Sequence, residues 1–399
     1  MLGFVLNTHQ QWMCRQLADR GYIVSRQVAV TDSGPEIQAA VADSMTRANL
    51  ILVTGGLGPT SDDRTREMIA QLLGKSLRED PETLRHIDSF FGRRNRPAPA
   101  STRLQAMVPD GAAVLINQNG TAPGLVMEFE KGLIIMLPGP PRELRPMFTN
   151  QVLPLVMTKF GKPEDFACTV LRTTGIGESF LEERVAPSLC KLHGLELGYC
   201  ARVGEVDLRL IAQGPNAFEI VNEAEKLSRN LLRTFIYGKN EDQLDSTIVR
   251  LLTEKHETLA LAESCTGGYI ANRITNIPGA SAVFLAGCVT YSNTAKEIFL
   301  GVNPTTLAAN GAVSEPVARE MAEGIRKATG AHHALSITGI AGPGGGSEEK
   351  PVGTVFIGLA TGGRTIVKHF VNQYDRETFK FLTSQQALEL LRRAILSMD

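Results

Sequence analysis

Short apolar runs alternate with helical patterns along the first 160 residues of this chain. The segment EIQAAVADSMTRA has apolar residues at helical spacing, whereas Leu50 to Val53 and Leu133 to Leu137 are continuous apolar runs that lead into glycine or proline. VSRQVAV is a further short run of this kind. Continuous runs are typical of strands buried on both faces, and their alternation with helices is the βαβ rhythm of a parallel sheet. We therefore expect an α/β domain over residues 1–160, with its site at the carboxyl ends of the strands.

The pattern changes between residues 161 and 240. Apolar and polar positions alternate at Val203, Val206, Leu208 and Leu210, and the helical segment FEIVNEAEKLSRNLLRTF follows. Such alternation indicates an antiparallel sheet with one exposed face. This region is predicted to be a small α+β domain.

The α/β rhythm returns over residues 241–399. ETLALAES, FLAGCVTYS, ALSITGIAG and VGTVFIGLA are predicted strands separated by helices. Ser314-Glu315-Pro316 is a typical helix start, and Val317, Met321 and Ile325 form the apolar stripe of that helix. The fold class is thus α/β, with two α/β domains joined by a small α+β domain.

Composition, charge and cysteine spacing argue against several classes of protein. A length of 399 residues with 43% hydrophobic residues suits two or three domains, and a net charge of -1 argues against non-specific nucleic-acid binding. No apolar run is long enough to span a membrane, and no basic leader precedes one. The six cysteines form no C-x-x-C pair, which argues against a disulfide framework or a zinc site. We expect a cytoplasmic protein that recognises a small molecule, with no nucleic-acid or membrane partner.

A candidate nucleophile lies where the strand ETLALAES meets the helical segment YIANRITN. Ser264, in the motif AESCTGG, is expected at the strand end, and backbone N–H groups near Thr266 and Gly267 would stabilise an oxyanion. The alternative is that Ser264 only caps the following helix. No histidine is well placed as its base, but a desolvated Lys296, in VTYSNTAK, is a candidate base, with Tyr291 nearby. The alternative for Lys296 is a solvated lysine at a helix start.

A second group of loops lies in the first region. Thr54-Gly55-Gly56-Leu57-Gly58-Pro59 follows a predicted strand, and its glycine N–H groups are suited to a phosphate. Asp62 and Asp63 are candidate ligands of a divalent metal ion, or alternatively cap the helix REMIAQLLG. The phosphate-binding motif G-x-x-x-x-G-K-[ST] is absent, which argues against a nucleoside triphosphatase.

Several long motifs in residues 241–399 resemble one known domain. AESCTGG, VTYSNTAK, GAVSEPVA, SITGIAGPGGGSEEKPVGTV and Tyr374-Asp375-Arg376 are similar to the nicotinamide-nucleotide amidohydrolase domain of the CinA (competence/damage-inducible) family. In that family the domain converts nicotinamide mononucleotide to nicotinate mononucleotide and ammonia, a step of pyridine-nucleotide salvage. The resemblance implies a homodimer and an amidase that needs no cofactor.

The same resemblance implies roles for individual residues. Ser264 would be the nucleophile, Lys296 its base, and Tyr291 would assist proton transfer. The residues expected to contact substrate are Thr266, Gly267, Thr338, Gly339, Ala341, Gly342 and, at the nucleotide phosphate, Arg376.

The rest of the chain resembles the other parts of full-length CinA proteins. Residues 1–160 look like their molybdopterin-binding-like domain, which in some members hydrolyses ADP-ribose with a metal, and residues 161–240 look like their KH-like domain. The GIGE loop of that region is followed by acidic SFLEE, so we expect a structural role rather than RNA binding. The chain starts at Met1-Leu2-Gly3-Phe4, where the family has a first strand and a G-T-E-L-L-x-G loop. We therefore expect either that the start codon is placed too late or that this domain has lost a central strand and one edge of its pocket. The alternative functions are therefore a metal-dependent ADP-ribose pyrophosphatase and a non-catalytic nucleotide-binding protein.

Overall fold

The computed structural model describes residues 7–161, 163 and 165–397, which divide into two compact units, 1–166 and 167–399. Each unit is described by itself. Within the described residues, no helix has the length and apolar character needed to cross a lipid bilayer.

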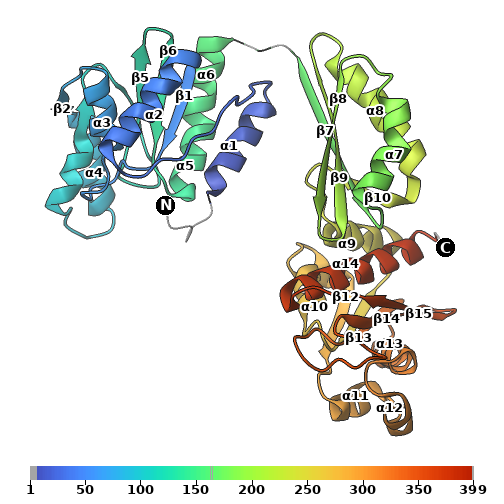
Figure 1. The fold of residues 1–399 in the computed structure, drawn as a ribbon. Helices are drawn as coiled ribbons and strands as arrows, with labels where there is room; N and C mark the ends of the chain where they lie inside the picture. The colour runs from blue at the N-terminus through green and yellow to red at the C-terminus, as the bar shows by residue number, and fades with distance from the viewer. Residues whose placement is uncertain (1–6, 162, 164, 398–399) are drawn as a thin grey trace. The chain divides into compact units, whose positions relative to one another are not determined.

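The first unit is built on a four-stranded sheet in the order β1-β6-β5-β4. Its strands are β1 (Leu50–Thr54), β4 (Ala113–Leu115), β5 (Gly124–Phe129) and β6 (Gly132–Leu137), with a separate pair of β2 (Leu77–Glu79) and β3 (Met107–Pro109). Its helices are α1 (Thr8–Ala18), α2 (Gly34–Arg47), α3 (Thr65–Leu72), α4 (Pro81–Gly92), α5 (Pro141–Met147) and α6 (Leu153–Phe160). Figure 1 shows this unit in blue to blue-green.

The predicted parallel sheet of this unit is mostly wrong. Only β1 and β6 are parallel, whereas β5 pairs antiparallel with both β6 and β4. The reason is local, because only Glu130 and Lys131 separate β5 from β6, and a two-residue connection can only join antiparallel neighbours.

The run VSRQVAV also differs from its prediction. It contains no strand, and Val28 and Val30 are exposed. A strand needs a hydrogen-bonded neighbour, and on the open side of β1 no strand is found within the residues that the structure describes. The predicted absence of a first strand concerns residues 1–6, which lie outside the described residues.

The second unit begins with a sheet in the order β10-β7-β9-β8. It contains β7 (Phe166–Thr174), α7 (Glu178–Leu189), β8 (Leu195–Arg202), β9 (Glu205–Gln213), α8 (Ala217–Leu232) and β10 (Ile236–Lys239). Figure 1 shows α7 and α8 packed on one side of this sheet, as expected for antiparallel strands with one exposed face. The predicted α+β arrangement is confirmed here.

The rest of the second unit is a five-stranded sheet in the order β12-β11-β13-β14-β15. Its strands are β11 (Leu259–Glu263), β12 (Phe284–Val289), β13 (His333–Gly339), β14 (Thr354–Ala360) and β15 (Thr365–Val371). Its helices are α9 (Leu244–Lys255), α10 (Tyr269–Thr275), α11 (Asn293–Leu300), α12 (Pro304–Asn310), α13 (Glu315–Thr329) and α14 (Arg376–Ile395). The four predicted strands are present, and β15 is an additional edge strand.

Helices cover both faces of this sheet. Leu335 and Leu359 share a core with Leu388 of α14, whereas the neighbouring Ala334 and Ala360 share a different core with α13. Successive residues of a strand point to opposite faces, so α13 and α14 lie on opposite sides of the sheet. Strands β11, β12 and β13 are parallel, and their carboxyl ends therefore meet at one edge.

Candidate active site

Ser264 lies directly after β11, in a tight turn that leads into α10. Gly267 and Gly268 in this turn have φ values of 63° and 88°, a left-handed conformation that favours glycine. Gly268, not Ser264, occupies the N-cap position of α10, which excludes the alternative of a simple helix cap. Ser264 is buried but retains 8% of its exposure, so a ligand that enters the turn can reach its hydroxyl.

Lys296 reaches Ser264 from the next strand-to-helix connection. Because β11 and β12 are parallel neighbours, the turn after β11 and helix α11 after β12 lie at the same edge of the sheet. The Nζ of Lys296 lies 3.1 Å from the Oγ of Ser264 and donates a hydrogen bond of 2.7 Å to the carbonyl oxygen of Thr290. The structure thus brings together the two residues that the sequence predicts as nucleophile and base.

Burial changes the chemistry of this lysine. Lys296 retains only 1% of its exposure, and desolvation lowers the pKa of its amine, although the nearby Cys265 opposes the shift. Burial also raises the pKa of the Cys265 thiol to about 12, so that it stays neutral. A lysine with a lowered pKa has a larger fraction of free amine at neutral pH, and that lone pair can accept the serine proton.

Glu263 holds the turn from beneath, a role that the sequence analysis missed. Its buried carboxylate accepts hydrogen bonds from the backbone N–H groups of Gly268, Ile270 and Ala271, at 3.1, 3.2 and 2.9 Å. These contacts satisfy N–H groups at the start of α10 that have no partner within the helix. The only signal in the sequence is an acidic residue immediately before a strand-to-helix turn.

The predicted oxyanion donors have different positions in the turn. The N–H of Gly267 donates to the carbonyl oxygen of Ser264 at 3.1 Å, so it is already used. The N–H of Thr266 has no acceptor in the described part of the chain. The Oγ1 atoms of Thr266 and Thr290 are likewise buried without a hydrogen-bond partner there. Thr266 is completely buried, so its predicted part as an oxyanion donor stays a prediction.

Tyr291 and Arg376 lie at the rim of the site and contact each other. Arg376 donates one hydrogen bond to the Tyr291 hydroxyl at 3.0 Å and another to the carbonyl oxygen of Gly342 at 2.9 Å. Tyr291 is 64% exposed, and it makes no hydrogen bond to Ser264 or Lys296. Its predicted part in proton transfer therefore stays a prediction.

The end of β13 and the loop after it contain the remaining predicted substrate contacts. The Thr338 hydroxyl donates to the carbonyl oxygen of Ala312, so this side chain supports the loop. A β-carbon on Gly339 would stand 2.7 Å from the Thr354 carbonyl oxygen, which explains the glycine there. Ala341 is buried, and Gly342 has a φ of 77°. Direct contacts of these residues with a substrate stay predictions.

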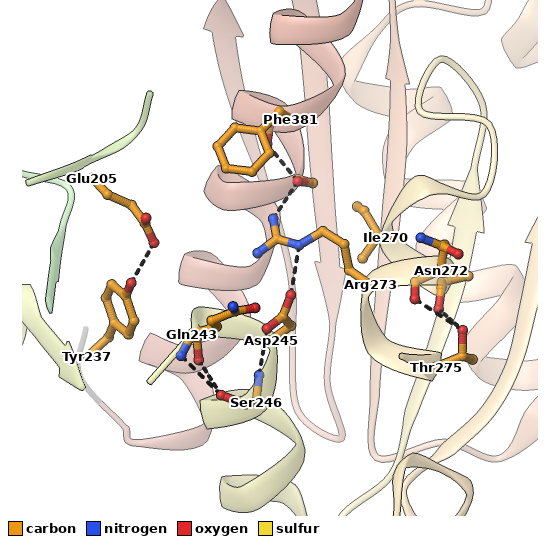
Figure 2. A network of polar contacts seen from close by, with 12 residues as sticks. Glu205, Tyr237, Gln243, Asp245, Ser246, Ile270, Asn272, Arg273, Thr275 and Phe381 are labelled. Atoms are coloured by element: carbon orange, nitrogen blue, oxygen red, sulfur yellow. Dashed lines mark hydrogen bonds and ion pairs between the residues drawn. The ribbon is translucent and has the colours of Figure 1, made fainter. Parts of the chain in front are cut away.

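A polar network holds α10 in place behind the site. Arg273 of α10 forms an ion pair of 3.1 Å with Asp245 of α9 and stacks over the ring of Phe381 of α14, as Figure 2 shows. It also donates to the Ser384 hydroxyl at 2.7 Å. Figure 2 further shows Glu205 accepting the Tyr237 hydroxyl hydrogen bond, which ties β9 to β10. Through Arg273, the helix that follows Ser264 is joined to two other helices.

The glycine loop of the first unit, Thr54 to Pro59, differs from the turn at Ser264. The carboxylate of Asp63 accepts hydrogen bonds from the N–H and the hydroxyl of Thr60, and it lies against Gly58. Neither Asp62 nor Asp63 caps α3, whose N-cap position is Arg64. Across the described ranges, no group of three or more His, Cys, Asp or Glu residues could hold a metal ion. The divalent metal site that the sequence suggests at Asp62 and Asp63 stays a prediction.

Comparison with known proteins decides the family. Three family models match this chain: the "Probable molybdopterin binding domain" over residues 1–158, the "Damage-inducible protein CinA KH domain" over 169–238 and the "CinA C-terminal domain" over 241–395. A competence-damage inducible protein of Moorella thermoacetica is 44% identical over 398 residues, with 99% of this chain and 96% of the relative covered. The chain belongs to the CinA family.

Other relatives agree with this assignment. A CinA-like protein of Akkermansia muciniphila is 44% identical and covers 97% of this chain and 93% of its own length. Among solved structures, the competence/damage inducible protein CihA of Agrobacterium tumefaciens is 38% identical, with 39% of this chain and 97% of that chain covered at a TM-score of 0.37. The three family models give this CinA chain a molybdopterin-binding-like domain, a KH domain and a CinA C-terminal domain.

Proposed function

We propose that this CinA protein is a cytoplasmic amidohydrolase that converts nicotinamide mononucleotide to nicotinate mononucleotide and ammonia, in pyridine-nucleotide salvage. The observation that carries the proposal is the buried Lys296 Nζ, 3.1 Å from the Oγ of Ser264. An amine with a lowered pKa beside a serine hydroxyl is the arrangement of a Ser-Lys hydrolase. The choice of substrate comes from the similarity of the AESCTGG and VTYSNTAK motifs to the family's amidohydrolase domain.

The first half of the reaction forms an acyl-enzyme. The Ser264 Oγ attacks the carboxamide carbon while its proton passes to the Lys296 Nζ. In this proposal the developing oxyanion accepts a hydrogen bond from the Thr266 N–H. Glu263 supports the turn by accepting hydrogen bonds from the N–H groups of Gly268 and Ala271. The C–N bond then breaks, and the protonated Lys296 gives its proton to the departing ammonia.

The second half repeats these proton movements with water. Lys296, again neutral, accepts a proton from a water molecule that attacks the ester carbon. Collapse of the second tetrahedral intermediate breaks the bond to Ser264 Oγ, which recovers its proton from Lys296. The carboxylate product is released, and neither step requires a metal or a cofactor.

The decisive experiment is an ammonia-release assay on nicotinamide mononucleotide. We expect Ser264→Ala to lower kcat by about a thousandfold or more, since removal of a nucleophile leaves only binding and oxyanion stabilisation. Ser281→Ala, at an exposed serine outside the site, is the matched control and should retain full activity. Full activity of Ser264→Ala would exclude the proposed nucleophile. Tight binding of substrate by the wild-type chain without turnover would favour a non-catalytic nucleotide-binding protein.

The proposal includes a homodimer through the edge strand β12. Leu285 and Val289 on this strand are 48% and 49% exposed, and Ile298 and Phe299 of α11 are 70% and 62% exposed. An edge strand with apolar neighbours is suited to pairing with a second copy of the same chain. Light scattering at micromolar concentration should give the mass of a dimer, and Ile298→Glu should shift it to that of a monomer.

A further inference from the structure

Two cations lie one helical turn apart on α14, beside the Ser264 turn. Arg376 contacts Gly342 and Tyr291, as described above. Lys380 is half-buried, and its Nζ lies 4.0 Å from the point where a β-carbon on Gly267 would stand. The same Nζ lies 5.5 Å from the ring centre of Tyr269. Because residues four apart share a helix face, both cations face the rim of the site.

Neither cation has a carboxylate partner among the residues described by the structure. The two hydrogen bonds of Arg376 go to neutral oxygens, and Lys380 contacts an aromatic ring and a glycine. The adjacent carboxylate of Asp375 accepts from the N–H groups of Glu377 and Thr378 and from the Thr378 hydroxyl instead. Two positive charges thus stand beside the candidate nucleophile without compensation, a setting that favours binding of an anion.

We propose that Lys380 joins Arg376, the residue already expected at the nucleotide phosphate, in holding the phosphate monoester of the substrate, and that Lys380 determines specificity for a nucleotide over a nucleoside. A phosphate monoester carries nearly two negative charges and three acceptor oxygens at neutral pH. Arg376 offers a planar fork and Lys380 a compact ammonium group, so that together they match this charge. The inference rests on the proposed function and adds Lys380, which the sequence analysis did not single out.

The test compares two substrates that differ only in the phosphate. Ammonia release by the full chain is measured with nicotinamide mononucleotide and with nicotinamide riboside, for the wild type and for Lys380→Gln. We expect the KM for the nucleotide to rise roughly tenfold, the size of one lost charge-assisted hydrogen bond at a partly exposed position, while kcat changes less than twofold. Kinetics with the riboside should not change. Lys380→Arg, which keeps the charge, should restore most of the affinity for the nucleotide.

A matched control and an independent measurement distinguish failure of the anion subsite from failure of the proposed amidohydrolase activity. Lys327→Gln removes an exposed lysine of α13 outside the site and should leave all parameters unchanged. Equal losses with both substrates, or no loss with either, would overturn the subsite while leaving the amidohydrolase intact. If the wild type releases no ammonia, calorimetry on Ser264→Ala still decides: the subsite requires tighter binding of nucleotide than of riboside, with the difference lost in Ser264→Ala/Lys380→Gln. Equal binding of both compounds would refute it.

Discussion

Two glycine-bearing segments of this protein share the pattern T-G-x-x-G-P at the end of a strand, and the second of them lies beside the candidate nucleophile. The loop at Thr54 to Pro59 is stabilised from within, since Asp63 is bonded to Thr60. The buried ionisable group next to it is Arg66, which cannot act as a base because a guanidinium remains protonated. The segment Thr338 to Pro343 comes directly after Ile337, whose carbonyl oxygen accepts a hydrogen bond from the Ser264 N–H, and Ser264 lies 3.1 Å from the buried Lys296. The backbone pattern is therefore the same in the two segments, and the buried, deprotonatable lysine near Ser264 is what distinguishes the candidate site.

The largest expected effect on activity comes from replacing Lys296. Lys296→Met should lower kcat for ammonia release by about three to four orders of magnitude, because no other base lies at Ser264. Activity within tenfold of the wild type would show that another group takes the proton and would remove the distinction between the two loops.

Lys296→Met should lower activity but increase the stability of the folded chain. The pKa of Lys296 is lower in the folded than in the unfolded chain, so the unfolded chain binds more protons between these two values. Stability contributed by this group therefore rises with pH across that interval, and the buried lysine is destabilising below it. Lys296→Met should raise Tm most at low pH, as measured by thermal unfolding from pH 6 to pH 10. A pH-independent change in Tm would argue against a shifted pKa.

The activity of the wild type should follow the same titration. Below the folded pKa of Lys296, kcat/KM should rise about tenfold per pH unit, since only the free amine is a base. The midpoint should lie below the ordinary pKa of lysine. A midpoint at the ordinary value would mean that burial does not tune this group.

A smaller loss of activity is expected when Glu263, which supports the Ser264 turn, is replaced. In Glu263→Gln, the amide NH2 would face the N–H groups of α10, so that the turn loses part of its hydrogen bonding. We expect kcat to fall about ten- to a hundredfold with little change in KM, in the same ammonia-release assay. Glu254→Gln, at an exposed position of α9, is the matched control. An unchanged kcat would show that the turn holds its shape without Glu263.

The smallest effect is expected in the first unit. Asp63→Ala removes the hydrogen bonds to Thr60 and should destabilise this unit by about 1 kcal/mol, measured by denaturant unfolding, without any effect on ammonia release. If the wild type cleaves ADP-ribose with a metal, and this activity is lost on chelation and in Asp63→Ala, the first loop is an active site as well. That result would contradict the distinction between the two loops.

The sequence predicts the central pair of the site because its logic is topological. Ser264 and Lys296 each follow an apolar run that ends in a turn, and the carboxyl ends of neighbouring parallel strands meet. Glu263 and Lys380 could not be found in this way, since their contacts depend on how a turn and a distant helix pack together. The pairing direction of the first sheet was predictable in part, because the two residues between β5 and β6 already require a hairpin.

The cysteine beside Ser264 has a practical consequence for handling this protein. Alkylating agents and peroxides react with thiolates, and the Cys265 thiol has a pKa raised to about 12 and retains only 6% of its exposure. Iodoacetamide or mild oxidation should therefore leave the Ser264 turn chemically intact. An assay run without reductant would report on the serine chemistry itself, even though a sulfur atom stands one residue away from it.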